Sequence, residues 1–149
     1  MAAAAARYGS PVRGWGRKTE LTALKHILVA TDGSELAGKA VSEGVRLASH
    51  LGAQLTFLTV TAPFASLGDH DAAFAHLPET VRAQALAYLA SEADRTLSAA
   101  LSAAQAAGLQ ADIIKVESRH PHEAIIVTAR SKGADLIVMA SHGRSGVKS

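Results

Sequence analysis

The chain has 149 residues, of which 48% are hydrophobic, 19% charged and 4% aromatic, and it contains no cysteine. This profile predicts one globular domain with an ordinary core, and it excludes disulfide scaffolds, thiol chemistry and zinc sites built on cysteine. The net charge is +2, but the first 24 residues carry +3 and leave −1 for the rest, so the body of the chain lacks the basic surface typical of nucleic-acid binding.

The first 24 residues combine an alanine run with scattered arginine, glycine and proline, and they show neither a strand period nor a helix period. This pattern predicts a disordered basic arm over residues 1–24, followed by the folded domain over residues 25–149. The sequence shows no export signal. It also shows no apolar run of ~20 residues, which is the length that a membrane span needs. Together with the absence of cysteine, this favours a cytoplasmic protein with no membrane partner.

The domain begins with an apolar run over residues 26–31, which is typical of a strand buried on both faces. A turn at residues 32–34 leads into a helix whose apolar residues recur every three or four positions. Ser34 is a suitable N-cap of this helix, and Gly52 is suited to end it. A second apolar strand is predicted over residues 55–60.

A long loop over residues 61–77 precedes a helix that begins at Pro78 and continues to Gly108. A third strand over residues 111–116, a helix from Pro121 to Gly133 and a fourth strand over residues 134–140 complete the order βαβαβαβ. This order predicts a Rossmann-like α/β fold, with an open, mostly parallel sheet and helices on both faces. The apolar face expected to bury the long helix consists of Val81, Ala85, Leu89, Ala93, Leu97 and Leu101.

Asp32 is the first candidate for chemistry, because it follows the first strand at the end where α/β proteins gather ligand-binding groups. Its carboxylate could accept a hydrogen bond from a ribose hydroxyl or an adenine amine, or could ligate Mg²⁺. The alternative is a local turn in which the same carboxylate only caps the following helix. The residues alone leave both interpretations open.

The glycine-rich segment after the fourth strand is the second candidate. Gly143 and Gly146 could present backbone N–H groups to a phosphate, and the adjacent His142 could contact a phosphate or pack on a base. The segment is not a Walker A motif, because Val147 stands where that motif requires glycine. The other histidines show no metal-binding pattern, and no nucleophile elbow predicts a hydrolase.

Four segments together give the chain a specific resemblance. In their order and spacing, over about residues 25–146, they resemble the universal stress protein (UspA) family. The segments are Ile27-Leu-Val-Ala-Thr-Asp-Gly-Ser34, Leu55 to Val60, His120-Pro-His-Glu-Ala-Ile-Ile126 and Ala134-Asp-Leu-Ile-Val-Met-Ala-Ser-His-Gly-Arg144.

The resemblance implies a Rossmann-like fold and, in one branch of the family, a site for ATP, with Mg²⁺ as a possible companion. The family's phosphate signature G-x-x-G-x₉-G-[ST] departs here in two places: Ala140 stands at its first glycine, and its distal pair would fall just beyond Ser149. The final helix and strand of the family fold are also missing, which predicts a chain truncated at its C-terminus. The site residues implied are Ala30, Asp32, Val60, Met139, Ala140, His142, Gly143 and Gly146.

The function expected from this resemblance is an adenine-nucleotide-binding regulatory module of the stress response, not a dedicated enzyme, which dimerises in its full-length form. The alternative is a protein of the same fold that binds no nucleotide and acts through dimer or partner contacts. Asp32, Val60 and Gly143 favour the first, whereas Ala140 and the early end of the sequence favour the second. Weak ATP binding by these 149 residues is therefore expected.

The last predicted strand carries a further expectation. No following strand is available to pair with the outer edge of residues 136–139, and that edge is apolar. An open apolar edge invites pairing with other chains, so the sequence predicts that these 149 residues self-associate irregularly or are marginally stable.

Overall fold

The computed structural model describes residues 3–7, 24–63 and 75–141. The elements within these ranges follow the order expected from the sequence, with one strand added before them. They are β1 (Ala3–Arg7), β2 (His26–Ala30), α2 (Glu35–Leu51), β3 (Gln54–Thr61), α5 (Glu79–Ala106), β4 (Asp112–Glu117), α6 (Pro121–Lys132) and β5 (Leu136–Ala140).

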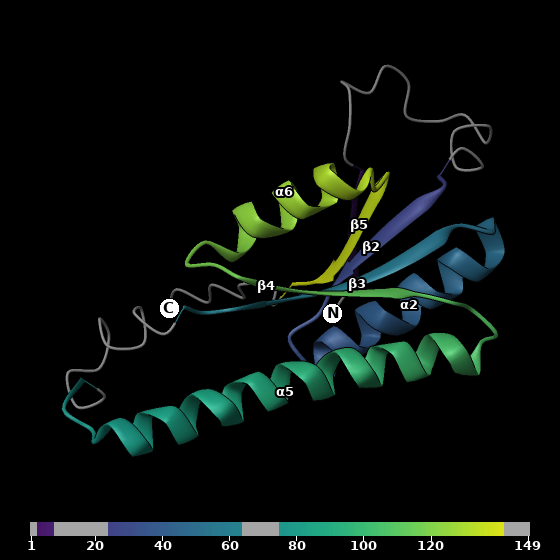
Figure 1. Ribbon diagram of the computed structural model, residues 1–149. Coiled ribbons are helices and arrows are strands. Elements are labelled where there is room, and N and C mark those ends of the chain that lie inside the picture. The colour runs from purple at the N-terminus through teal and green to yellow at the C-terminus, as the bar shows by residue number, and fades with distance from the viewer. Residues whose placement is uncertain (1–2, 8–23, 64–74, 142–149) are drawn as a thin grey trace, which may run out of the picture.

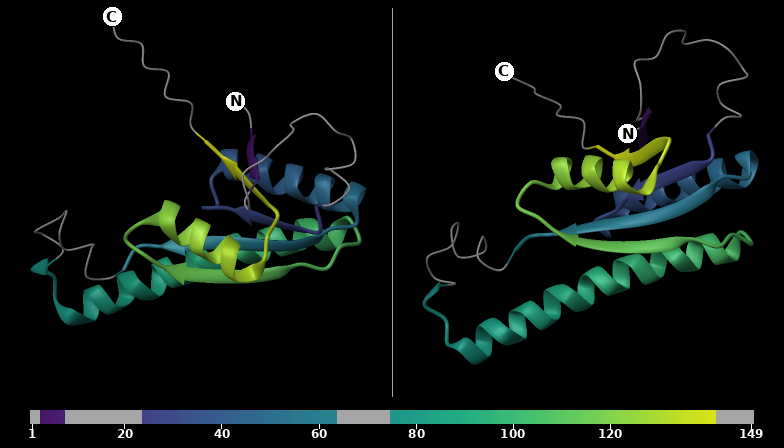
Figure 2. Two further views of the ribbon diagram at one scale, coloured as in Figure 1. Left: turned by 90° about the horizontal axis from the view of Figure 1, so that it is seen from above. Right: turned by 45° about the horizontal axis from the view of Figure 1, so that its top comes forward.

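The strands form one sheet in the order β1-β5-β2-β3-β4, in which β5, β2, β3 and β4 run parallel. Helices α2 and α5 cover one face of the sheet and α6 covers the other (Figures 1 and 2). The predicted α/β class, with a mostly parallel sheet between two helical layers, is confirmed. Ser34 caps α2 as expected, and Gly52 and Gly133 end α2 and α6 in the left-handed conformation that glycine favours.

The N-terminal strand β1 was not expected. Ala3–Arg7 pairs antiparallel with β5, so the prediction of disorder is wrong for these five residues, while residues 8–23 lie outside the described part. The expectation that the outer edge of β5 has no pairing strand is wrong for the same reason. An edge strand presents a row of backbone N–H and C=O groups, and an extended segment can pair with them whatever its side chains. That backbone pairing outweighs the poor strand propensity of alanine.

The core has two parts, one on each face of the sheet. Between the sheet and helices α2 and α5, the side chains of Val29, Phe57 and Val138 are fully buried. On the other face, Leu28 and Leu58 pack with Ile125 and Ala129 of α6. The central strands are therefore apolar on both faces, which explains why they appear in the sequence as continuous hydrophobic runs.

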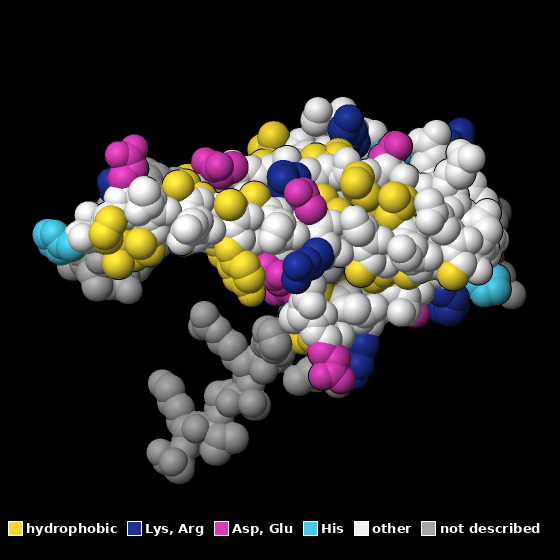
Figure 3. Space-filling model, turned by 60° about the horizontal axis from the view of Figure 1, so that its bottom comes forward, with side chains coloured by type: hydrophobic (Ala, Val, Ile, Leu, Met, Phe, Trp, Pro, Cys, Tyr) yellow, Lys and Arg dark blue, Asp and Glu magenta, His cyan; other side chains and the backbone are white. Residues whose placement is uncertain are grey.

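Helix α5 buries only its second half. Ala93 and Leu97 are buried as expected, but Val81 and Leu89 are 40% and 43% exposed. The first half of α5 extends past the edge of the sheet, and hydrophobic side chains lie open along this end (Figures 1 and 3). The prediction of one continuous buried face is therefore wrong for Val81 and Leu89, because helical periodicity shows which residues share a face but not how far the neighbouring sheet extends.

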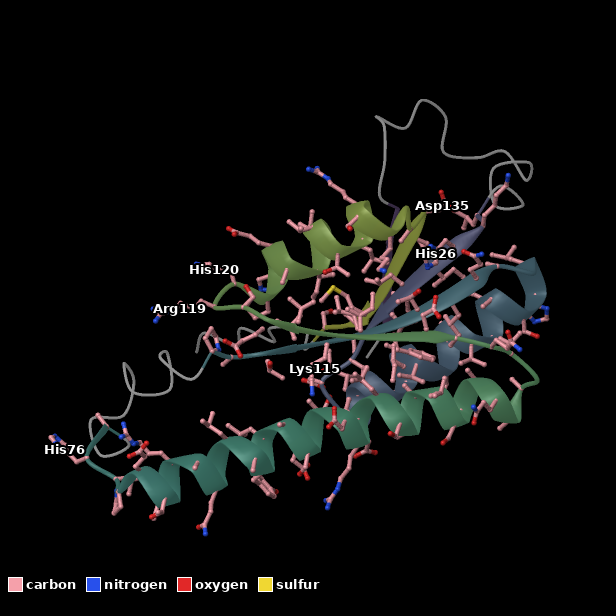
Figure 4. All side chains as sticks on the ribbon, in the orientation of Figure 1. His26, His76, Lys115, Arg119, His120 and Asp135 are labelled. Atoms are coloured by element: carbon pink, nitrogen blue, oxygen red, sulfur yellow. The ribbon has the colours of Figure 1, made fainter. Side chains whose placement is uncertain are left out.

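The amino ends of β2 and β5 are joined by Asp135 and His26, which lie next to each other in Figure 4. Asp135 Oδ2 accepts hydrogen bonds from the backbone N–H groups of Lys25 and His26, at 2.9 and 3.0 Å. The His26 ring lies 3.1 Å from the carbonyl oxygen of Lys132 and 2.8 Å from the buried Thr56 hydroxyl. One carboxylate and one imidazole thus connect β2, β3 and the loop after α6.

We expect Asp135→Ala to lower the free energy of unfolding by about 2 kcal/mol, because two backbone N–H groups lose a charged acceptor. Urea denaturation followed by circular dichroism measures the effect. Asp94→Ala is the matched control, since Asp94 makes an exposed ion pair with Lys115, for which a change of at most about 1 kcal/mol is expected. Equal losses for the two variants would contradict this role of Asp135.

Candidate functional site

A cavity of about 280 Å³ opens at the carboxyl ends of β2, β3 and β5. From β2 the chain moves outward through β3 to β4 and then crosses back to β5 on the other side of β2. Sheets of this kind bind ligands at such a reversal of strand order, where the two crossovers diverge and leave a crevice. The cavity therefore lies where the topology favours a binding site.

Five of the predicted site residues line this cavity together. Ala30 and Asp32 come from the end of β2, Val60 from the end of β3, and Met139 and Ala140 from the end of β5. They are far apart in sequence and meet because parallel strands end at the same edge of the sheet. The remaining predicted residues, His142, Gly143 and Gly146, lie outside the described part of the chain.

The turn after β2 shows how Asp32 is placed. Asp32 Oδ1 accepts a hydrogen bond from Ser34 N–H at 2.9 Å, and Ser34 Oγ in turn accepts from Ala37 N–H at 3.1 Å. Gly33 adopts a φ of +80°, which lets the chain turn sharply beside the carboxylate. The capping role left open by the sequence is thus present, and the same exposed side chain also lines the cavity.

Val60 brings backbone groups to the cavity. The ladder between β2 and β3 ends where Thr31 N–H donates to the Leu58 carbonyl at 2.9 Å. Because backbone groups alternate between the two edges of a strand, those of Val60 are the next to face β2. There β2 has already turned away, so the Val60 N–H and C=O lie beyond the last bond of the ladder.

The cavity has residues that the sequence interpretation missed. His122 is the most informative of them, because the sequence analysis assigned it no part in ligand binding. The loop after β4 also lies at the carboxyl ends of the strands, where ligands bind in sheets of this kind. The first turn of α6, which follows this loop, could therefore have been predicted to contribute to the site. The missed residues are Thr31, Ser34, Leu36, Ala37, Leu58, Pro121, His122 and Ile125.

Two helix N-termini contribute to the charge environment of the cavity, beside the Asp32 carboxylate. The first turns of α2 and α6 both contribute to its wall, through Ser34 and Leu36 on one side and Pro121 and His122 on the other. Unpaired N–H groups and the helix dipole give each end a partial positive charge. The walls are otherwise mainly apolar, so the cavity is suited to a flat apolar group attached to an anionic one.

Two other features of the described residues are not part of this site. A hollow of about 450 Å³ lies at the amino ends of β3 and β4. Gln54, Gln105 and Asp112 contribute to its lining. Among the residues that the structure describes, no group of three His, Asp or Glu side chains is placed to hold a metal ion. Arg119 and His120 lie at the loop between β4 and α6, whereas His76 lies at the far end of α5 (Figure 4).

No helix within the described ranges is apolar enough over a sufficient length to cross a membrane, including the 28-residue α5. Comparison with solved structures finds proteins that share the fold just described. A universal stress protein family member from Burkholderia pseudomallei is 27% identical, with a TM-score of 0.64 over 80% of this chain and 83% of that one.

Two more distant structures carry adenine nucleotides. A universal stress protein in complex with cAMP has a TM-score of 0.59 at 23% identity, covering 83% of this chain and 78% of that one. A universal stress protein from Archaeoglobus fulgidus in complex with dAMP has a TM-score of 0.53 at 18% identity, covering 74% and 75%. At these identities the likeness concerns the fold.

Sequence comparison gives the family directly. Universal stress protein YxiE of Bacillus subtilis (strain 168) is 32% identical over 122 residues, which is 82% of each chain. The model of the universal stress protein family matches residues 23–149. The parallel sheet, the cavity at its switch point and these two matches agree: the chain belongs to the universal stress protein family.

Proposed function

We propose that the chain binds an adenine nucleotide in the cavity at the carboxyl ends of β2, β3 and β5. The observation that carries this proposal is the meeting of Ala30, Asp32, Val60, Met139 and Ala140 around one crevice at the switch point. A cavity of about 280 Å³ is at the small end of the range for ligand sites, so it suits the adenosine part and leaves the phosphates outside.

Each wall has a function in this proposal. Ala30, Val60 and Met139 give an apolar surface for the adenine ring, and the backbone of Val60 offers hydrogen bonds to its edge. Asp32 accepts from the ribose hydroxyl groups or the adenine amine. The phosphates extend toward the N-termini of α2 and α6, where partial positive charge stabilises them. A Mg²⁺ ion would be held mainly by phosphate oxygens, with Asp32 as the nearest carboxylate on the protein.

The ligands of the two distant family structures support the class of ligand. cAMP and dAMP share the adenine ring and one phosphate, and they differ in the sugar and in how the phosphate is attached. A site that takes the adenosine part of the ligand is compatible with ATP as well as with these monophosphates. ATP with Mg²⁺ is the specific ligand proposed for this chain.

A regulatory function in the cytoplasm, in which nucleotide occupancy is the signal, fits this site better than catalysis. Asp32 and His122 are the ionisable side chains among the described residues that line the cavity. Asp32 Oδ1 accepts from the Ser34 N–H, and in this proposal Asp32 binds the ribose or the adenine amine, away from the phosphates where a general base for hydrolysis would act. In this proposal the family's stress-response role and its dimeric state apply to the full-length protein.

Isothermal titration calorimetry of the intact chain with ATP, AMP and GTP, each with Mg²⁺, tests the proposal. We expect both adenine nucleotides to bind and GTP to bind at least tenfold more weakly. Ala30→Leu should weaken ATP binding by more than tenfold, because it fills the space meant for the ring while keeping an apolar side chain. Asp32→Asn should weaken it about tenfold, which corresponds to ~1.4 kcal/mol.

Asp112→Asn is the matched control for Asp32→Asn, since Asp112 is exposed at the amino end of β4, away from the cavity at the carboxyl ends of the strands. We expect it to bind ATP like the unchanged chain. Thermal melting of every variant shows whether the fold is retained. ATP binding that is unaffected by both Ala30→Leu and Asp32→Asn would place the nucleotide elsewhere and contradict the proposal.

Partner binding without nucleotide is the second candidate function. It is favoured by the exposed apolar side chains on the first half of α5, Val81, Tyr88 and Leu89. A folded chain that gives no heat with any of the nucleotides would support it. In that case Tyr88→Glu and Leu89→Glu should abolish partner binding without lowering the melting midpoint, because neither side chain contributes to the core.

A further inference from the structure

The turn after β2, residues 31–34, contacts helix α5 as well as the cavity. Gly33 has a φ of +80°, and a Cβ added to it would lie 2.5 Å from Oγ1 of Thr96. The Thr96 hydroxyl therefore fills the space beside Gly33 that a side chain would need. Asp32, the neighbouring residue, lines the cavity, whereas Thr96 does not. The turn thus connects a residue of α5 to the candidate nucleotide site.

Thr96 lies where α5 first meets the domain. Ala93 and Leu97 are the first buried residues of the helix, and the half before them extends past the sheet (Figure 1). On this face of the sheet α5 also contacts α2, the helix that begins directly after the turn. Because this packing fixes the second half of α5, Thr96 is a firm support for the turn.

The Thr96 side chain is itself held in one orientation. Its Oγ1 donates a hydrogen bond to the carbonyl oxygen of Glu92, one helical turn earlier, at 2.9 Å, and the residue is half-buried. A threonine in a helix has few accessible rotamers, and this hydrogen bond selects among them. The hydroxyl oxygen is thereby kept against Gly33.

The hydrogen bonds inside the turn have a different role. Gly33 N–H donates to Thr31 Oγ1 at 3.3 Å, and Ser34 N–H donates to Asp32 Oδ1 at 2.9 Å. Both join residues of the turn to one another, so they set its shape. The contact with Thr96 comes from another helix and limits how far the turn can move toward α5. We propose that Thr96 is a positioning residue of the nucleotide site, which keeps the Asp32 carboxylate where the nucleotide binds; this inference rests on the function proposed above.

Removing the support should lower the fraction of chains whose turn is in the binding conformation, and the apparent affinity falls in proportion to that fraction. In isothermal titration calorimetry, Thr96→Ala should therefore weaken ATP binding about fivefold. Thr96→Ser keeps the hydroxyl oxygen and should stay within about twofold of the unchanged chain. Thr80→Ala is the matched control, because it makes the same substitution on the exposed first turn of α5, and it should bind ATP like the unchanged chain.

Two measurements distinguish this role from a general loss of stability. The melting midpoint of Thr96→Ala should stay close to that of the unchanged chain, because alanine is the better helix former and offsets the lost contacts. In the Asp32→Asn background, Thr96→Ala should weaken ATP binding by less than about twofold, since both substitutions act on the same carboxylate. Additive losses in the double variant, or equal affinities for Thr96→Ala and Thr96→Ser, would overturn the proposal.

Exchange of the Ser34 amide tests the contact without any nucleotide. This N–H is bound to Asp32 Oδ1, so its exchange with solvent reports how often the turn opens. In nuclear magnetic resonance of the ligand-free chain, we expect exchange at least about threefold faster in Thr96→Ala than in Thr80→Ala. Equal rates would overturn the role of Thr96, whereas a lack of ATP binding by the unchanged chain would contradict the proposed function.

Discussion

Replacing Phe57 by alanine is expected to lower the free energy of unfolding by about 4 kcal/mol, which is the largest single effect predicted for this chain. Phe57 is the largest of the side chains that the fold buries completely, and it lies on β3 between the sheet and helix α5. Removing the ring leaves a cavity that the surrounding strands cannot close. Since the free energy of unfolding of a domain is only about 5–15 kcal/mol, this substitution would remove a large part of it.

Urea denaturation monitored by circular dichroism measures this loss. Ile113→Ala is the matched control, because Ile113 is the partner of Phe57 in the ladder between β3 and β4 but is 45% exposed. It is expected to cost about 1 kcal/mol, as less apolar surface is uncovered. Similar costs for the two variants would mean that the α5 face of β3 is not the packed core described above.

Replacing Gly44 by leucine is expected to cost about 3 kcal/mol or more, because α2 lies too close to the sheet for any side chain there. A Cβ added at Gly44 would be 2.3 Å from Cγ2 of Val29, which is itself fully buried on the central strand β2. Helix and strand would have to separate, and the packing of the whole α2 layer would change. Gly44→Ala should already destabilise, although alanine is the better helix former.

Gly38, on the same helix, is the control position. A Cβ at Gly38 meets nothing within 4 Å, so Gly38→Ala should raise the free energy of unfolding by up to about 1 kcal/mol. Combining Gly44→Ala with Val29→Ala tests the contact itself, because the space released at Val29 should recover part of the loss. A Gly44→Ala variant as stable as Gly38→Ala would show that α2 packs further from β2.

The element order and most element boundaries follow from local rules in the sequence. The apolar runs of β2 and β5 reflect burial on both faces, and the caps at Ser34, Gly52 and Gly133 reflect the backbone groups that a helix end must satisfy. The position of Asp32 directly after the first strand was enough to predict that it lines the crevice. These properties depend on residues within one or two turns of each other, so the sequence shows them directly.

The tertiary structure decided what depends on the extent and edges of the sheet. The periodicity of α5 predicted a buried face, but the first half of the helix extends past the sheet (Figure 1), and Leu89 is exposed. Ala3–Ala6 has no strand pattern, and it becomes a strand because the outer edge of β5 supplies hydrogen-bonding partners from a segment more than 100 residues away. His122 lines the cavity because the loop after β4 also lies at the carboxyl ends of the strands, which follows from the topology of the sheet and not from the residues around His122. Such contacts are made between distant segments, and no local pattern of residues encodes them.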